Sequence, residues 1–235
     1  MITKRTLGLF TLALASALSL RANDITGTIT IEHKLTKPRV TPTGDLYERG
    51  VAVQLGANQQ QDPLQYERAH VVIYLEGDFA TRGITADLNQ LDRRFTPDLV
   101  VVPVNSTVSF PNLDPIFHNV FSLSKVKSFD LGNYPKDHSR TVTFNKPGIV
   151  FVGCHLHANM SAVIVVTPNR WGVMSDPDGH FTLRDVPPGT YTVVAWHKTA
   201  GFFRKKIEVT ADHKAIVDFA IPIDENGAPI QEARK

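Results

Sequence analysis

The sequence of 235 residues contains a single cysteine, Cys154. One cysteine cannot form a disulfide within its own chain, covalent c-type haem needs a CxxCH motif, and iron–sulfur clusters and structural zinc usually need several cysteines. The composition therefore argues against all of these groups. Three simple explanations remain for the thiol: a small buried hydrophobic side chain, an intermolecular disulfide, or a free nucleophile.

Long hydrophobic runs are also scarce. The apolar run over residues 7–20, which follows Lys4 and Arg5, has about 14 residues, whereas a bilayer span needs roughly 20. Small residues offer cleavage points after Ala17 or Ala22, so we predict a signal peptide over residues 1–22 rather than an uncleaved anchor. The expected product is a periplasmic or secreted protein with no membrane span after cleavage.

A strong excess of one charge is missing as well. The chain has 25 basic and 23 acidic residues, and cleavage after Ala22 would remove Lys4, Arg5 and Arg21, leaving 22 basic residues and a net charge of −1. A nucleic-acid partner, which would require a clustered basic face, is therefore not expected. Hydrophobic residues at 42% and charged residues at 20% indicate one large or two small globular domains.

The single cysteine lies in the stretch FVGCHLHANM, residues 151–160. Short runs rich in β-branched residues predict strands over 139–144, 149–152 and 161–167, so the cysteine follows one strand and precedes another. Upstream, strands are predicted over 99–104 and 107–110, followed by a loop and by His118 and Asn119 at the end of another strand region. Two polar centres thus occur near strand ends.

Thiolate and imidazole ligands suit zinc, iron or copper, but a thioether is a soft ligand that favours copper. One thiolate, two imidazoles and a weak thioether form the trigonal copper site used for electron transfer, here His118, Cys154, His157 and Met160. His155 directly follows the cysteine, so its side chain should point to the opposite face of the strand end. We therefore interpret it as a surface histidine or as a residue that tunes the site.

These residues give the region 93–166 a resemblance to the cupredoxins, the family of plastocyanin, pseudoazurin and amicyanin. A histidine followed by asparagine matches the upstream ligand, and CxxHxxM has the short spacing of amicyanin. Leu156 departs from the family, since proline is common at that place. The resemblance implies a Greek-key β-sandwich over residues 84–167, one type 1 copper, and an Asn119 amide that donates to the cysteine sulfur while its side chain braces the loop.

A second resemblance lies in DPDGHFTLRDVPPGTYTVVAW, which is similar to the carboxypeptidase regulatory-like module, a prealbumin-type sandwich. Further strands are predicted over 25–32, 51–55, 69–76, 172–175, 180–184, 189–197, 204–209 and 215–221. The resulting all-β prediction is one sandwich built from residues 24–80 and 168–223 and interrupted by the cupredoxin domain, with a tandem order as the alternative. Residues 224–235 are interpreted as a polar tail.

Several other polar residues receive structural interpretations. We interpret Asp114 and Asp130 as turn formers, and Asp176 with Gly179 as part of a hairpin turn rather than a calcium loop. His180 and His197 lack a third ligand at a recognisable spacing, so no second metal site is predicted.

The expected function is one-electron transfer without catalysis, because protein ligands would fill the copper coordination sphere. Its partner would be a periplasmic redox protein such as a dehydrogenase or a c-type cytochrome, as the resemblance to amicyanin implies. Exported proteins of this kind often carry the label methylamine utilization. Two alternatives stay open: a copper-binding chaperone or buffer, and a structural β-sandwich that binds no copper.

Overall fold

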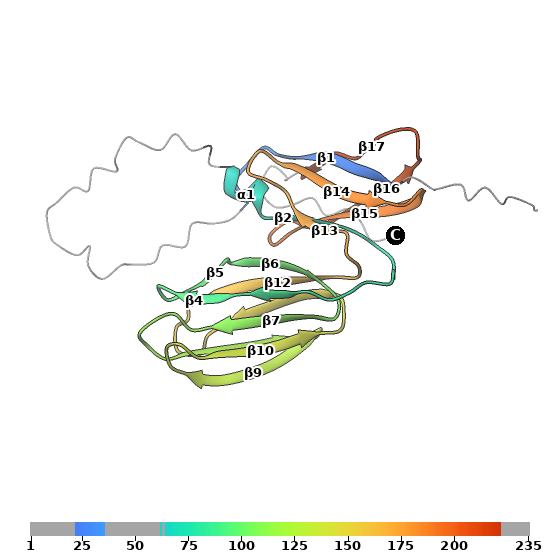
Figure 1. Cartoon of the computed structure of the whole chain (residues 1–235). Coiled ribbons are helices and arrows are strands. Elements are labelled where there is room, and N and C mark those ends of the chain that lie inside the picture. The colour runs from blue at the N-terminus through green and yellow to red at the C-terminus, as the bar shows by residue number, and fades with distance from the viewer. Residues whose placement is uncertain (1–21, 36–61, 63, 222–235) are drawn as a thin grey trace, which may run out of the picture.

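The computed structural model describes residues 22–35, 62 and 64–221. Within these residues, the regular structure is β-strand apart from the short helix α1 (Gln65–Ala69). Figure 1 shows two β-sandwiches stacked on each other, which confirms the all-β prediction. The predicted strand over 51–55, the predicted tail over 224–235 and nearly all of the predicted signal peptide lie outside the described residues. No helix in the described ranges is long and apolar enough to span a bilayer.

The outer sandwich combines strands from both ends of the described chain. One sheet has the order β14-β1-β17, with β18 also paired to β1, and the other has the order β13-β2-β15-β16. Ile25 of β1 and Ile73 of β2 share a core with Leu183 and Val193, because alternate residues of each strand face the opposite sheet. The strands are β1 (Asn23–Ile31), β2 (Val71–Leu75), β13 (Gly172–Met174), β14 (His180–Val186), β15 (Gly189–His197), β16 (Gly201–Val209), β17 (Ala215–Ile216) and β18 (Phe219–Ile221).

The inner sandwich lies between β2 and β13 in the sequence. One sheet has the order β6-β12-β11-β8-β9, a second has the order β10-β7-β3, and β4 pairs with β5. A core containing Phe110, Phe144 and Ile164 fills the space between the sheets. The strands are β3 (Thr85–Asp87), β4 (Asn89–Leu91), β5 (Arg94–Thr96), β6 (Leu99–Pro103), β7 (Ser106–Pro111), β8 (His118–Ser124), β9 (Lys127–Tyr134), β10 (Ser139–Phe144), β11 (Gly148–Gly153) and β12 (Ser161–Thr167).

A small apolar cluster joins the two sandwiches. Leu99 of β6 and Val163 and Val165 of β12 pack against Val72 of β2 and Trp196 of β15. The chain crosses between the sandwiches twice, after β2 and after β12. The inner sandwich is therefore held to the outer one by two chain connections as well as by packing.

Some predicted elements need correction. The turn at Asp176 to Gly179 is present, with the Asp176 side chain accepting the amides of Asp178 and His180, but it is not a hairpin turn. The strands it connects, β13 and β14, belong to different sheets, because β13 pairs with β2 and β14 pairs with β1. The predicted strand over 69–76 starts only after α1 and His70, and the strand over 215–221 is divided into β17 and β18.

Candidate metal centre

The sheet of the inner sandwich brings two distant segments together. His118 is the first residue of β8, and Cys154 directly follows β11. Because Gly153 pairs with Phe121, the end of β11 lies beside the beginning of β8. The loop over residues 154–160 then returns to β12, with the Met160 amide donating to the His157 carbonyl at 3.0 Å. We predicted His118 near the end of a strand, but it is the first residue of β8.

Three side chains converge at this place. Cys154 Sγ lies 4.0 Å from His118 Nδ1 and 3.8 Å from His157 Nδ1, and the two Nδ1 atoms are 3.1 Å apart. A first-row metal ion with bonds of about 2.3 Å to sulfur and about 2.0 Å to nitrogen, at trigonal angles, would separate sulfur from nitrogen by about 3.7 Å. The three atoms therefore fit around one ion with only small adjustments. In the described ranges this is the one group of three or more potential His, Cys, Asp or Glu ligands.

Met160 ends the loop and is buried, with 2% of its surface exposed. It belongs to the same apolar cluster as Cys154. The fourth predicted ligand is therefore shielded from water beside the cysteine, although core packing alone would also bury a methionine.

The Asn119 contacts connect β8 to the cysteine loop. Its backbone amide donates to Cys154 Sγ at 3.4 Å, and its side-chain oxygen accepts the His155 amide at 3.3 Å. Both contacts expected for this residue are present. A hydrogen bond to the sulfur stabilises a thiolate, and the second bond fixes the first turn of the loop.

Asp114 is a polar partner of the site that sequence reasoning missed. Its carboxylate is 4% exposed and lies 2.7 Å from His118 Nε2, and it also accepts the amides of Asp92 and Arg93. Burial opposes its ionisation, but these hydrogen bonds outweigh burial and lower the pKa of Asp114. Since an ionised carboxylate only accepts, Nε2 carries the proton and the lone pair of Nδ1 faces Cys154. The only sequence signal was a carboxylate four residues before the histidine.

His155 turns away from the other three side chains. Its ring stacks on Phe121 with centroids 3.7 Å apart, and Nε2 lies 3.6 Å from a carboxylate oxygen of Asp130. Asp130 also accepts the side-chain amide of Asn119 at 2.7 Å. Asp130 lies within β9 rather than in a loop, but its carboxylate does accept the Gly132 amide two residues on, and it also braces the residue that contacts the cysteine.

His157 is the more accessible of the two converging imidazoles, whereas His118 is fully buried. Burial is the main cause that lowers the pKa of His157, and the neighbouring His118 and Arg93 add to it, so its ring is neutral and able to coordinate near neutral pH. Large apolar side chains adjoin the two histidines in sequence, with Phe117 57% and Leu156 47% exposed.

His180 and His197, the other histidines considered above, lie on β14 and β15 of the outer sandwich. His197 is buried, and its Nε2 lies 3.1 Å from Glu67, while Nδ1 accepts the amides of Thr199 and Ala200. His180 is exposed and contacts Thr28. His197 therefore has a packing role in the outer sandwich.

Comparison with known proteins finds a likeness to solved structures over part of this chain. No protein-family profile and no curated protein matches the chain. Copper-containing nitrite reductase from Thermus scotoductus SA-01 is 22% identical with a TM-score of 0.34, over 39% of this chain and 24% of that protein. A reduced amicyanin variant is 22% identical with a TM-score of 0.33, over 34% of this chain and 79% of its own.

A purple cupredoxin from Nitrosopumilus maritimus is 20% identical with a TM-score of 0.31, over 32% of this chain and 84% of its own. The chain spans about a quarter of the length of the nitrite reductase. At these low similarities, the functional proposal depends on the side chains described above.

Proposed function

We propose that the protein is an exported type 1 copper protein that carries single electrons between redox partners and is not itself an enzyme. The observation that carries this proposal is the convergence of one thiol and two imidazole nitrogens in a largely buried pocket beside a buried methionine. Hard cations do not favour this donor set, and a thioether beside it favours copper over zinc. His118, Cys154, His157 and Met160 would hold the ion.

Bound copper would supply a centre that accepts and releases one electron. The residues of this chain prepare the site for it. Asp114 orients the His118 ring, and the Asn119 amide stabilises the thiolate of Cys154. These hydrogen bonds fix the positions of two ligands, and a site whose ligands stay fixed suits electron transfer.

The partner would dock over the exposed side of His157. Phe117 and Leu156 give this end of the inner sandwich an apolar surface. Such a surface would be enough for a redox partner, because complexes between redox proteins are transient and have small interfaces. A periplasmic dehydrogenase or c-type cytochrome would fit the proposed location outside the cytoplasm. The second sandwich has no assigned role in this electron transfer.

Visible spectroscopy of copper-loaded protein tests the proposal. We expect an intense thiolate-to-copper(II) band that disappears on reduction, returns on oxidation and is absent from Cys154→Ser. A colourless and redox-silent wild-type protein would refute the electron-carrier role. A colourless copper(I) form that passes its metal to an acceptor would indicate a chaperone, and failure to bind copper would indicate a structural sandwich.

A matched pair of variants tests the choice of histidine. His157→Ala should abolish the band, because its Nδ1 is 3.8 Å from the sulfur. His155→Ala should retain the band, because that ring stacks on Phe121 instead. The reverse result would show that the ligand assignment is wrong.

A further inference from the structure

A polar cluster crosses the boundary between the two sandwiches. Tyr66 belongs to α1, and His70 follows α1 and precedes β2 of the outer sandwich, whereas Asp98 precedes β6 of the inner one. The Tyr66 hydroxyl donates to Asp98 Oδ2 at 2.8 Å, and His70 Nε2 lies 3.0 Å from Asp98 Oδ1. The two rings stack with centroids 3.8 Å apart. One carboxylate of the inner sandwich is therefore held by two side chains of the outer one.

The protonation of His70 follows from its two partners. Nδ1 lies 2.7 Å from the Tyr66 carbonyl oxygen, which can only accept, so this nitrogen must donate. Nε2 faces the Asp98 carboxylate, which also only accepts when it is ionised. A neutral imidazole has one N–H and can satisfy only one of these partners. The full set of hydrogen bonds therefore requires the imidazolium form.

The surrounding charges favour this form. Desolvation opposes the charge of His70, but the hydrogen bonds to Asp98 and to the Tyr66 carbonyl, with the negative charges of Asp98 and Glu67, outweigh it and raise the pKa of His70. His197 also faces this region from β15, but it is neutral, because its Nδ1 accepts two backbone amides and burial lowers its pKa. The bond from His70, followed by the bond from Tyr66 and opposed by burial, lowers the pKa of Asp98 to about 2.

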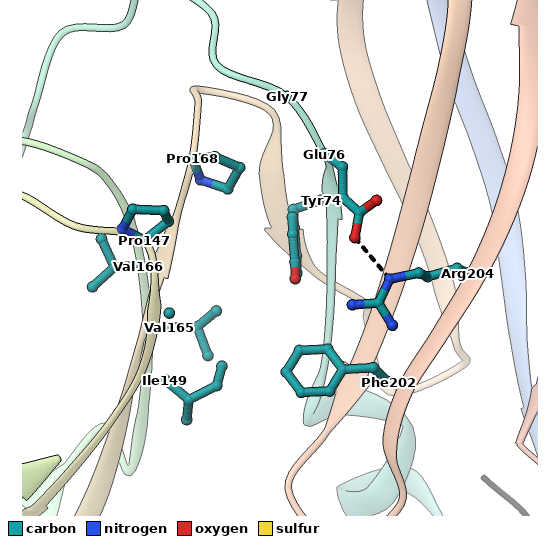
Figure 2. A pocket seen from close by; sticks show the side chains of 11 residues that line it. Tyr74, Glu76, Gly77, Pro147, Ile149, Val165, Val166, Pro168, Phe202 and Arg204 are labelled. Atoms are coloured by element: carbon teal, nitrogen blue, oxygen red, sulfur yellow. Dashed lines mark hydrogen bonds and ion pairs between the residues drawn. The ribbon is translucent and has the colours of Figure 1, made fainter. Parts of the chain in front are cut away.

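Apolar packing closes only part of the same boundary. Next to Asp98, Leu99 packs with Val72 and Trp196. Tyr74, Ile149 and Phe202 are only partly buried where they pack against this cluster. Together with Val165 they line a pocket of about 300 Å³, and Figure 2 shows Ile149 and Val165 on one wall with Tyr74 and Phe202 on the other. A boundary with this pocket leaves room for the sandwiches to change their angle while the two chain connections keep them together.

We propose that His70 is a proton-dependent clamp. Its imidazolium holds the outer sandwich to Asp98 of the inner sandwich, and loss of the proton allows the two sandwiches to change their relative orientation. A histidine whose charged form is favoured in the folded state stabilises that state most below its ordinary pKa. This stabilisation is lost as the pH rises through the raised pKa. The clamp is thus closed in mildly acidic surroundings and open in alkaline ones, and it does not depend on copper.

NMR spectroscopy of the full chain without added copper tests the clamp directly. The ring ¹⁵N and ¹³C shifts of His70 should show protons on both nitrogens at about pH 5.5 and a pKa above the ordinary value near 6.5. Asp98→Asn should lower this pKa, because the amide removes the negative charge. A wild-type His70 that titrates at or below the ordinary value would overturn the proposal, whether or not any variant folds.

Residual dipolar couplings then report the orientation of the sandwiches. A single fixed orientation of the two sandwiches should fit the couplings measured at about pH 5.5 but not those measured at about pH 8.5. These two pH values lie below and above the ordinary pKa of histidine. His70→Gln should remove this pH dependence, whereas the control His138→Gln should retain it, because His138 is exposed and its ring contacts the nearby Lys136 carbonyl oxygen. Couplings that are independent of pH in the wild type, or unaffected in His70→Gln, would contradict the clamp.

Discussion

Replacing Asp114 with asparagine tests whether this buried carboxylate positions His118 in the candidate metal centre. Three donors converge on its two oxygens: the Asp92 amide at 2.7 Å, the Arg93 amide at 2.8 Å and His118 Nε2 at 2.7 Å. Asparagine keeps the shape but has one acceptor oxygen, and its NH₂ group faces whichever donor remains. At least one of these donors, of which the two amides are part-buried and His118 Nε2 is buried, is therefore left without an acceptor.

The expected loss has two parts. In metal-free protein, one unsatisfied donor and the weaker remaining bonds should reduce the free energy of unfolding by about 1–3 kcal/mol. In addition, the His118 ring loses the partner that keeps the proton on Nε2, so the tautomer with a proton on Nδ1 becomes populated and cannot coordinate. Copper affinity should fall by about 10–100-fold, the usual effect of losing such a partner.

Two measurements check this prediction separately. Denaturant unfolding of metal-free protein gives the stability change, and competition with a chelator for copper(I) gives the affinity change. Asp87→Asn is a matched control, because Asp87 is exposed on β3 and undergoes the same chemical change. If Asp114→Asn unfolds within about 0.5 kcal/mol of the wild type, as a neutral surface substitution does, and binds copper equally well, the positioning role is wrong.

Three further predictions concern the loop, the boundary and the outer core. Met160→Leu should change the unfolding free energy by less than about 1.5 kcal/mol yet shift the reduction potential measured by spectroelectrochemistry, and an unchanged potential would remove Met160 from the ligands. Asp98, with its pKa lowered to about 2, contributes stability that is lost as the pH falls below about 3.8, so Asp98→Asn should flatten urea-unfolding stability over that window. Gly27→Ala should cost about 1–3 kcal/mol in thermal unfolding, because the new Cβ would lie 1.9 Å from the Val217 carbonyl oxygen, and an unchanged midpoint would contradict that close approach.

The strands that sequence predicted best are those with β-branched residues on a buried face. The bounds of β10, β12 and β15 agree with the predicted ranges, since each is closed by a turn or loop rich in Gly, Pro or Asn. β9 was missed because it is an edge strand whose residues are mostly exposed or half-buried, so its pattern is weak.

More of the candidate metal centre than of the residues around it could be predicted from the sequence. Cys154 and His157 lie three residues apart in one loop, so their proximity follows from local geometry. Asp114 and Asp130 become partners of the site only when β8, β9 and the loop before β8 are placed side by side. The cross-boundary cluster at Asp98 depends on the packing of two sandwiches, which no local pattern encodes.

The anchoring of the ligand loop favours electron transfer over metal delivery. A chaperone must open its ligands to release copper, whereas an electron carrier works best when its ligands stay fixed. The loop over residues 154–160 runs directly from β11 into β12, which lie side by side in one sheet, and β12 also packs against the outer sandwich through Val163 and Val165. At the other end of the loop, the Asn119 amide donates to Cys154 Sγ and the Asn119 side-chain oxygen accepts the His155 amide. Both ends of the loop are thus fixed by the fold, which supports the electron-carrier proposal. The outer sandwich contributes to this by packing against β12, the strand that follows the site.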